Sequence, residues 1–104
     1  MWTPKLEEEF EAVLWVMLRR SKSETSYVGT YFARMLKEHG GRRTAEILLA
    51  KPQPSEGFIR LSIEENKPEL TMEYVVASNP WNKLFSKSEV RKARSLLGEK
   101  APEC

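Results

Sequence analysis

The sequence has little of the chemistry that metal sites and disulfide frameworks require. Its 104 residues include one cysteine, Cys104, and one histidine, His39. A single thiol forms no intramolecular disulfide, which is typical of proteins from a reducing compartment. A structural zinc site needs about four Cys or His ligands at suitable spacing. The sequence therefore predicts no metal site, and nothing in it indicates a cofactor.

Excess charge of one sign and long apolar runs are also scarce. The 17 Lys and Arg residues nearly balance the 15 Asp and Glu residues, which leaves a net charge of +2. Proteins that coat nucleic acid usually carry a larger excess. The longest apolar run, residues 12–18, is too short to span a bilayer, and no signal-peptide pattern is present. We therefore expect a cytoplasmic protein that does not enter a membrane.

No pattern in the sequence indicates catalysis. The pair Gly40-Gly41 lacks the remaining spacing and the Lys-Ser/Thr of a phosphate-binding loop. His39 has no obvious nucleophile or carboxylate partner, so it is interpreted as a residue at a helix end. Cys104 is terminal, where an electropositive pocket that activates a thiol is seldom found. We predict that the protein is not an enzyme.

Apolar residues recur at helical spacing through the first half of the chain. A first helix should begin after Thr3-Pro4, a capping residue followed by a proline suited to the first helical position. Residues 21–26 are polar and predict a loop. A second apolar stripe runs from Val28 to Gly40-Gly41, where a glycine closes the helix, and a short third helix is expected over residues 42–50.

The middle of the chain has two interpretations. Apolar and polar residues alternate over 59–64 and again over 70–76, which is typical of a β-hairpin. The helical alternative places Ser55 and Thr71 as N-terminal caps of two short helices. Further on, Ser86 and Glu89 form a capping-box pattern that predicts a last helix ending at Gly98.

Several short groups of residues also stand in a familiar order between residues 10 and 97. They are Tyr27 with Phe32 and Met35; His39-Gly40-Gly41; Ala45 with Leu48-Leu49; Pro54 to Phe58 with Leu61; Leu70 to Glu73; Leu84-Phe85-Ser86; and Glu89 with Ala93-Arg94. In combination they resemble a small bacterial domain family that occurs alone or within larger proteins and has no established activity.

The resemblance implies helices at 56–63 and 71–77, and we prefer them to the hairpin on that ground. Gly29 departs from the pattern, which has a proline there, and residues 62–69 are more polar than in the family. The family supplies no catalytic residues, but its character suggests a link to bacterial defence or its inhibition. We predict an all-α, compact single domain of five to six short helices over residues 1–98, with a frayed tail at 99–104. The alternative is an α+β fold with a hairpin at about 58–76.

Two functional hypotheses follow. The first is a non-enzymatic interaction or regulatory module that acts through a protein partner or self-association. It depends on an excess of aromatic side chains over what a core this small hides, because aromatic residues are favoured anchors at interfaces. The candidate interface residues are Trp15, Tyr31, Tyr74 and Trp81.

The second hypothesis is a helix-turn-helix-like DNA-binding protein that uses residues 28–50. In such a motif the first residues of the second helix face the bases and the backbone, and here they are Arg42, Arg43 and Thr44. A further basic face on the last helix would add phosphate contacts. Its residues are Lys87, Arg91 and Arg94.

Overall fold

The first helix begins where the sequence predicts it. The computed structural model describes residues 1–103, and Cys104 lies outside that range. Helix α1, Pro4–Glu24, is capped by Thr3, whose hydroxyl accepts a hydrogen bond from the Leu6 amide at 3.1 Å. Its inward stripe buries Phe10, Leu14 and Leu18 in the core. The stripe thus fixes which face of α1 meets the rest of the domain.

The polar loop predicted at residues 21–26 starts later than expected. Helix α1 continues to Glu24 because its polar side chains bond back onto the helix. The Ser21 hydroxyl donates to the Met17 carbonyl at 2.9 Å, and Arg20 pairs with Glu24 at 2.9 Å one turn later. Thr25 then ends the helix by bonding the Ser21 carbonyl. Polarity alone did not distinguish these residues from a loop.

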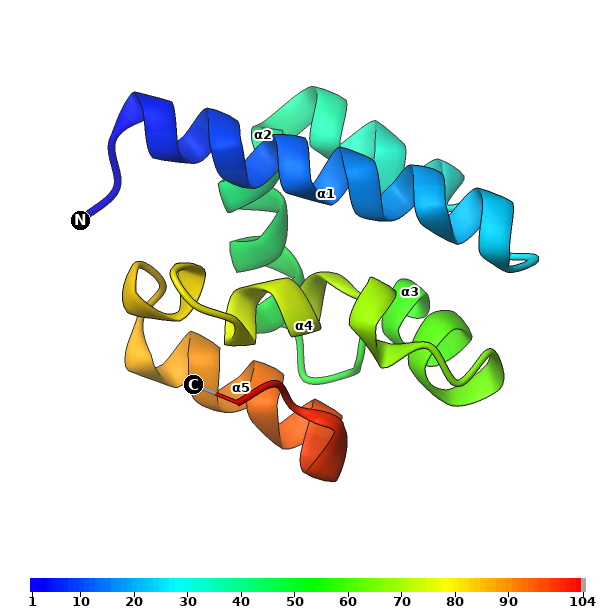
Figure 1. Cartoon of the computed structure of the whole chain (residues 1–104). Coiled ribbons are helices and arrows are strands. Elements are labelled where there is room, and N and C mark those ends of the chain that lie inside the picture. The colour runs from blue at the N-terminus through cyan, green and yellow to red at the C-terminus, as the bar shows by residue number, and fades with distance from the viewer. Residues whose placement is uncertain (104) are drawn as a thin grey trace.

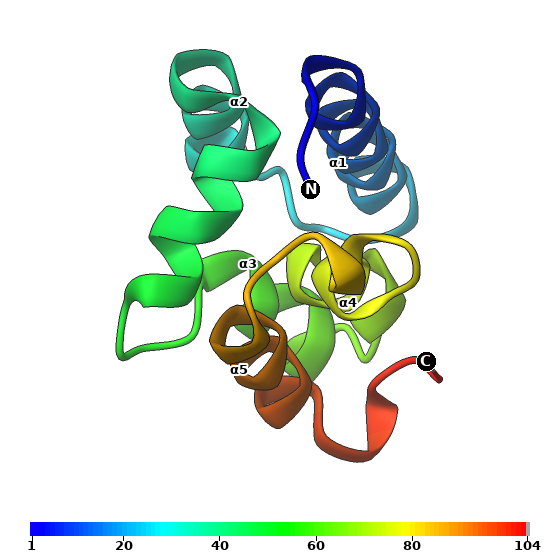
Figure 2. The same cartoon turned by 90° about the vertical axis from the view of Figure 1, so that its left-hand side faces the viewer.

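The predicted second and third helices form one element with a sharp break. Helix α2, Thr30–Ala50, contains a single non-helical residue, Gly40, at φ 78° and ψ 171°. That region of backbone space is essentially restricted to glycine. The first half of α2 lies beside α1, and the second half turns away toward α5 (Figures 1 and 2). The break therefore lets the two halves of α2 pack against different helices of the domain.

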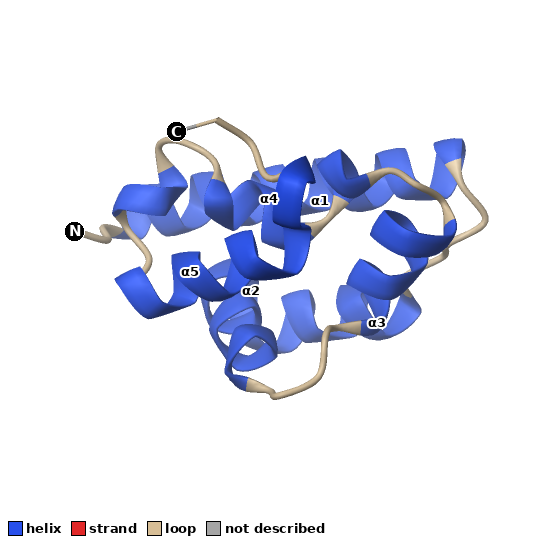
Figure 3. Ribbon diagram, turned by 90° about the horizontal axis from the view of Figure 1, so that it is seen from below, coloured by secondary structure: helices blue, strands red, loops and turns tan. Residues whose placement is uncertain are grey.

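Residues 56–64 and 72–77 are helical, and the hairpin alternative is wrong. Ser55 caps α3, Glu56–Phe58, which continues into a π-helical turn, Ile59–Glu64. Thr71 caps α4, Met72–Ala77, after a 3-10 turn at Pro68–Leu70. The alternation misled because Ile59 and Ile63 lie one turn apart on an exposed helical face, whereas Leu61 lies in the core. The described residues contain no strand (Figure 3).

The last helix also has the predicted ends. Helix α5, Lys87–Leu97, opens with a complete capping box between Ser86 and Glu89 and ends at Gly98, which has a positive φ of 59°. The segment predicted as a frayed tail starts with a 3-10 turn, Gly98–Lys100. Its Lys100 Nζ donates to the Asn66 side chain at 2.6 Å. The part of that prediction that concerns Cys104 falls outside the described residues.

An aromatic cluster joins the N-terminal segment to the turn that precedes α5. A 3-10 turn at Trp81–Lys83 brings Trp81 against the N-terminal segment, where its ring stacks on that of Trp2 with centroids 6.2 Å apart. Phe10 and Phe85 pack edge-on against these rings.

A second, smaller core lies between the end of α1 and the π-helical turn, around Leu18, Tyr27, Leu61 and Leu70.

The described residues thus form one all-α domain, as predicted, with a Cα radius of gyration of 12.4 Å. Helices α1 and α2, however, are longer than the short helices expected. Within residues 1–103, no helix combines the length and the apolar character needed to cross a membrane.

Candidate functional site

A groove opens between the start of α2 and the segment that leads into α3. We call it the α2–α3 groove; its volume is about 340 Å³, which is the scale of small-ligand and peptide-anchor sites. Tyr31 lies in its wall with 55% of its surface exposed, and the neighbouring Val28 is 58% exposed. Other residues that line it include Phe32, Leu48, Lys51, Pro54 and Glu56. The lining of the groove therefore combines apolar and polar side chains with one residue of each charge.

Val28 is exposed because α2 begins two residues later than the apolar stripe predicts. Gly29 takes the N-cap position in a left-handed conformation, at φ 69° and ψ 35°. A Cβ there would lie 2.5 Å from the Leu18 side chain, so the chain passes close to α1 at this point. The tight turn directs Val28 and Tyr31 outward, and it is the position where the family pattern has a proline.

The other three predicted interface aromatics are more buried than Tyr31. Trp81 belongs to the core and is 8% exposed. Trp15 and Tyr74 are half-buried against the core, and the Trp15 indole donates to the Glu11 carboxylate at 3.2 Å. Of the four candidates, Tyr31 is thus the one with most of its ring available to a partner.

Next to the groove lies a small cavity, and Glu73 is one of the residues that line it. It measures about 30 Å³, and its walls are mostly apolar. Glu73 is only 2% exposed, and the Ser55 hydroxyl donates to its Oε2 at 3.0 Å. Burial raises the pKa of the Glu73 carboxyl above its usual range, and the hydrogen bonds from its own backbone and Ser55 counter this in part.

The sequence carries no signal that separates Glu73 from an ordinary surface acid. It lies in the first turn of α4, where acidic residues are favoured by the helix dipole and usually face water. Its burial results from the way α3 packs over α4, which brings the cap residue Ser55 onto it. This contact joins residues 18 positions apart in the chain and was not predicted.

Tyr27 separates the groove from the cavity and lines both. The Arg60 guanidinium lies 5.7 Å from the centre of its ring. Burial raises the pKa of the Tyr27 phenol, and Glu56 and Glu73 raise it further while Arg60 acts against them. At Gly57 a Cβ would come within 3.0 Å of the phenol oxygen. The glycine therefore leaves the space that this hydroxyl occupies.

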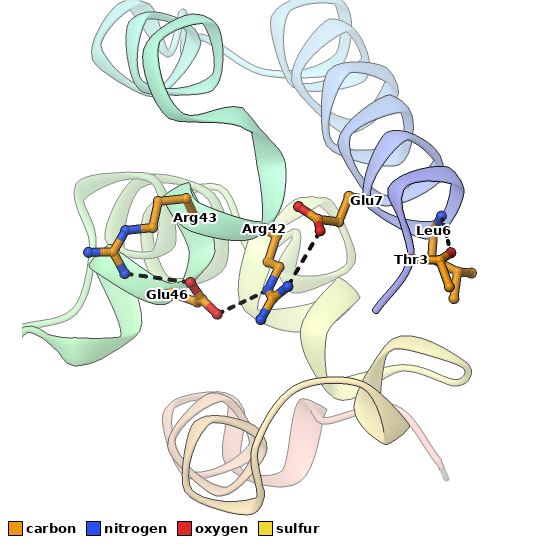
Figure 4. Close-up of polar contacts among 6 residues, drawn as sticks. All are labelled: Thr3, Leu6, Glu7, Arg42, Arg43 and Glu46. Atoms are coloured by element: carbon orange, nitrogen blue, oxygen red, sulfur yellow. Dashed lines mark hydrogen bonds and ion pairs between the residues drawn. The ribbon is translucent and has the colours of Figure 1, made fainter. Parts of the chain in front are cut away.

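The arginines predicted to contact DNA are engaged in ion pairs within the protein. Arg42 lies between Glu7 at 3.4 Å and Glu46 at 3.2 Å, and Arg43 approaches the other side of Glu46 at 3.5 Å (Figure 4). The Arg42 guanidinium also lies 5.2 Å from the centre of the Trp2 ring. Arg42 thus links α2 to the N-terminal segment.

Thr44, the third residue of the predicted DNA-contacting set, is completely buried. Its hydroxyl has no hydrogen-bond partner among the described residues. The side chain faces the core because it follows the Gly40 break by one turn, on the face of α2 that also carries Ala45 and Leu48. In this conformation Thr44 does not reach a bound molecule.

The basic residues of α5 do gather on one surface. Lys87, Arg91 and Arg94 line an open hollow with Asn82, and none of the three forms an ion pair with residues 1–103. Glu46, the partner of Arg42 and Arg43, lines a different hollow with Ser86, Ser88, Glu89 and Lys92. The two predicted basic sets therefore do not share a hollow.

The described part of the chain brings no three His, Cys, Asp or Glu side chains together as a metal site would require. His39 lies 3.8 Å from Glu38, its sequence neighbour, and both side chains are exposed. Cys104 lies outside the described residues.

No known protein family, curated protein or solved structure gives a match to the chain. The resemblance to a bacterial domain family therefore stays a prediction.

Proposed function

We propose that this protein is a non-enzymatic interaction module of the cytoplasm that holds a segment of a protein partner in the α2–α3 groove. The exposure of Tyr31 carries the proposal. A large aromatic side chain costs little conformational entropy when it is fixed, so it is a favoured anchor at interfaces. Tyr31 is largely exposed in the wall of a groove that Phe32 and Leu48 also line.

Part of the groove wall is helical, which favours binding. One wall belongs to α2, and the opposite wall is the segment 51–57, which ends in the capped turn of α3. A surface that is already ordered loses little entropy when a partner binds. Lys51 and Glu56, which both lie on the segment 51–57, supply polar contacts that would orient a bound segment.

The experiment is site-specific photo-crosslinking in the native host. A photoreactive phenylalanine replaces Tyr31 in one variant and the exposed Lys22 of α1 in the control variant. We expect an adduct with one protein from position 31 and not from position 22. The partner is then purified, and Tyr31→Ala should weaken its binding by about 2 kcal/mol or more, the size typical of an interface anchor.

A second copy of the chain is the other partner considered. Sedimentation of the purified protein over a range of concentrations distinguishes it, because self-association would raise the mass with concentration and Tyr31→Ala would abolish the rise. A monomer at all concentrations, together with no adduct specific to position 31, contradicts the proposal.

DNA binding is the second candidate function, and one observation favours it. The three basic residues of α5, Lys87, Arg91 and Arg94, lie together without ion pairs to the described residues, although Arg94 donates to the Pro102 carbonyl at 2.9 Å. This would be a backbone-contacting surface on α5. The helix-turn-helix outline over 28–50 receives less support, because Arg42 and Arg43 pair with acidic residues and Thr44 is buried.

A further inference from the structure

Glu73 is a buried acid without a cationic partner. Within the described residues no Lys, Arg or His forms an ion pair with it, and Ser55 is the side chain that donates to it. Removing a carboxylate from water is costly unless a charge of opposite sign or several hydrogen bonds compensate. A glutamate as buried as this one is rarely found without such compensation. Its surroundings therefore lack the cation that its charged form requires.

The cavity beside Glu73 has the size of a small polar group. A site of 10–15 Å³ or more, measured by the same kind of probe, holds one water. At about 30 Å³ the cavity therefore has room for one compact head group. An ammonium is such a group, whereas the planar guanidinium of arginine is larger.

The cavity adjoins the α2–α3 groove. Tyr27, Phe32, Ser55 and Gly57 line both spaces, so they form the partition between them. The aromatic rings in this partition suit a cation, because the face of an aromatic ring attracts positive charge. A side chain that enters from the groove would therefore pass aromatic walls before it meets the carboxyl group.

We propose that the Glu73 cavity binds a primary ammonium group, supplied by a lysine side chain of the protein segment held in the α2–α3 groove. This inference rests on the proposed function for the source of the lysine. The ammonium would donate a hydrogen bond to the Glu73 carboxylate and lie against the aromatic partition. An ammonium also has three donors to share, which suits a site whose polar side chains include Ser21, Ser55 and Thr71.

Binding is coupled to proton release. Because burial raises the pKa of Glu73, its carboxyl group keeps its proton to a higher pH in the empty site than in water. When the ammonium enters, the Glu73 carboxylic acid loses its proton to solvent and becomes the carboxylate that pairs with it. At any pH where Glu73 is protonated in the empty site, each binding event therefore releases up to one proton.

The test uses n-butylammonium chloride as a probe for the lysine side chain. The purified protein is titrated with it while the carboxyl ¹³C resonance of Glu73, assigned with the Glu73→Gln variant, is followed by NMR. The control probes are 1-butanol, which has the same chain without charge, and sodium chloride at matched ionic strength. We expect a saturable shift toward the carboxylate position with butylammonium alone, accompanied by proton release in weakly buffered solution.

Two variants sharpen the test. Glu73→Gln should weaken butylammonium binding at least tenfold, because a neutral amide cannot pair with the cation. Gly57→Ala places a methyl group 3.0 Å from the Tyr27 hydroxyl in the partition, and should weaken binding while the capped turn of α3 remains. If either variant fails to fold, the Glu73 resonance is assigned through its backbone by triple-resonance NMR, and the wild-type titration decides the question.

An unmoved Glu73 resonance, or an equal response to butanol, overturns the inference. The titration needs no protein partner, so its failure is distinct from a failure of crosslinking at Tyr31. Once a partner is in hand, its lysines are changed to methionine one at a time. If no single change weakens the complex, lysine is overturned as the source of the cation.

Discussion

The backbone of Gly41 lies directly against that of Glu11. A Cβ on Gly41 would come within 2.8 Å of the Glu11 Cα, and the Gly41 amide donates to the Glu11 carboxylate at 3.2 Å. The absence of a side chain at this position therefore sets how closely α1 and α2 approach.

Gly41→Ala should destabilise the protein. In an ordinary helix this change stabilises by roughly 0.5–1 kcal/mol. Here the added methyl meets backbone that cannot move aside, so we expect a loss of about 1–3 kcal/mol, the usual cost of overpacking. Urea denaturation of this variant and of the exposed control Lys37→Ala measures the difference. A Gly41→Ala protein that is more stable than the wild type would contradict the close approach.

The raised pKa of Glu73 predicts how the free energy of unfolding depends on pH. Its pKa is higher in the folded protein than in the unfolded chain, so the folded state binds the proton more tightly. The contribution of this proton binding to the free energy of unfolding is fully present below the pKa of Glu73 in the unfolded chain, about 4.3. It is lost as pH rises through the higher pKa of Glu73 in the folded protein. The slope for one proton is at most about 1.4 kcal/mol per pH unit.

Glu73→Gln should remove this part of the pH dependence. Denaturation of both proteins between pH 4 and pH 9 gives the difference curve, in which the effects of all other groups cancel. We expect the glutamine variant to gain on the wild type as pH rises. A flat difference curve would mean that Glu73 titrates in the folded protein as it does in water.

The aromatic candidates divide into core and surface. Trp81→Ala should cost about 3–5 kcal/mol, because it removes a ring that packs on Trp2 and Phe10. Tyr31→Ala should change stability by no more than about 0.5 kcal/mol, as is usual for exposed positions. Thermal denaturation of the two variants under identical conditions makes the comparison. A large loss at Tyr31 would show that its ring supports the fold rather than a partner.

The capping box of α5 should contribute measurably to stability. The Ser86 hydroxyl accepts from the Glu89 amide at 3.1 Å, and the Glu89 carboxylate accepts from the Ser86 amide at 2.9 Å. Ser86→Ala should therefore cost about 0.5–2 kcal/mol. Ser95→Ala, an exposed change on the same helix, is the control and should be nearly neutral. Equal effects at the two positions would mean that the cap adds nothing.

Salt-dependent binding to duplex DNA tests the α5 surface. If Lys87, Arg91 and Arg94 contact phosphates, each contact adds about 0.9 to the slope of log affinity against log salt. Changing all three to Gln should then flatten the slope by roughly 2–3, by the same relation. Arg43→Gln, which removes the more exposed of the two paired arginines of α2, should leave it unchanged. No binding at low salt excludes this surface as a DNA site.

Much of the fold could be predicted from local patterns. Thr3, Ser55, Thr71 and Ser86 each cap a helix where the sequence indicates one, because capping depends on a side chain and an amide three residues away. The choice of helices over the hairpin depended on the family resemblance, since alternation over a few residues fits either structure.

The candidate site was less predictable, because tertiary contacts determine it. The pattern placed Val28 in an inward stripe, but the turn at Gly29 exposes it. The sequence pattern also indicated that Arg42 is free to contact DNA, but Glu7, 35 residues away, pairs with it. Burial of Glu73 depends on how α3 packs on α4. The Arg42–Glu7 pair and the burial of Glu73 depend on residues distant in sequence, which local patterns do not encode. The Arg42–Glu46 pair, by contrast, has the four-residue spacing of a helix.

The stacked rings of Trp2 and Trp81 give the protein a built-in optical reporter. These two indoles join the N-terminal segment to the turn at residues 81–83. The third indole, Trp15, lies within α1 and donates a hydrogen bond to Glu11 of the same helix. In a Trp15→Phe protein, all tryptophan emission and the tryptophan part of the near-ultraviolet dichroism would come from the stacked pair. Release of the N-terminal segment could then be timed separately from the unwinding of helices seen in the far ultraviolet.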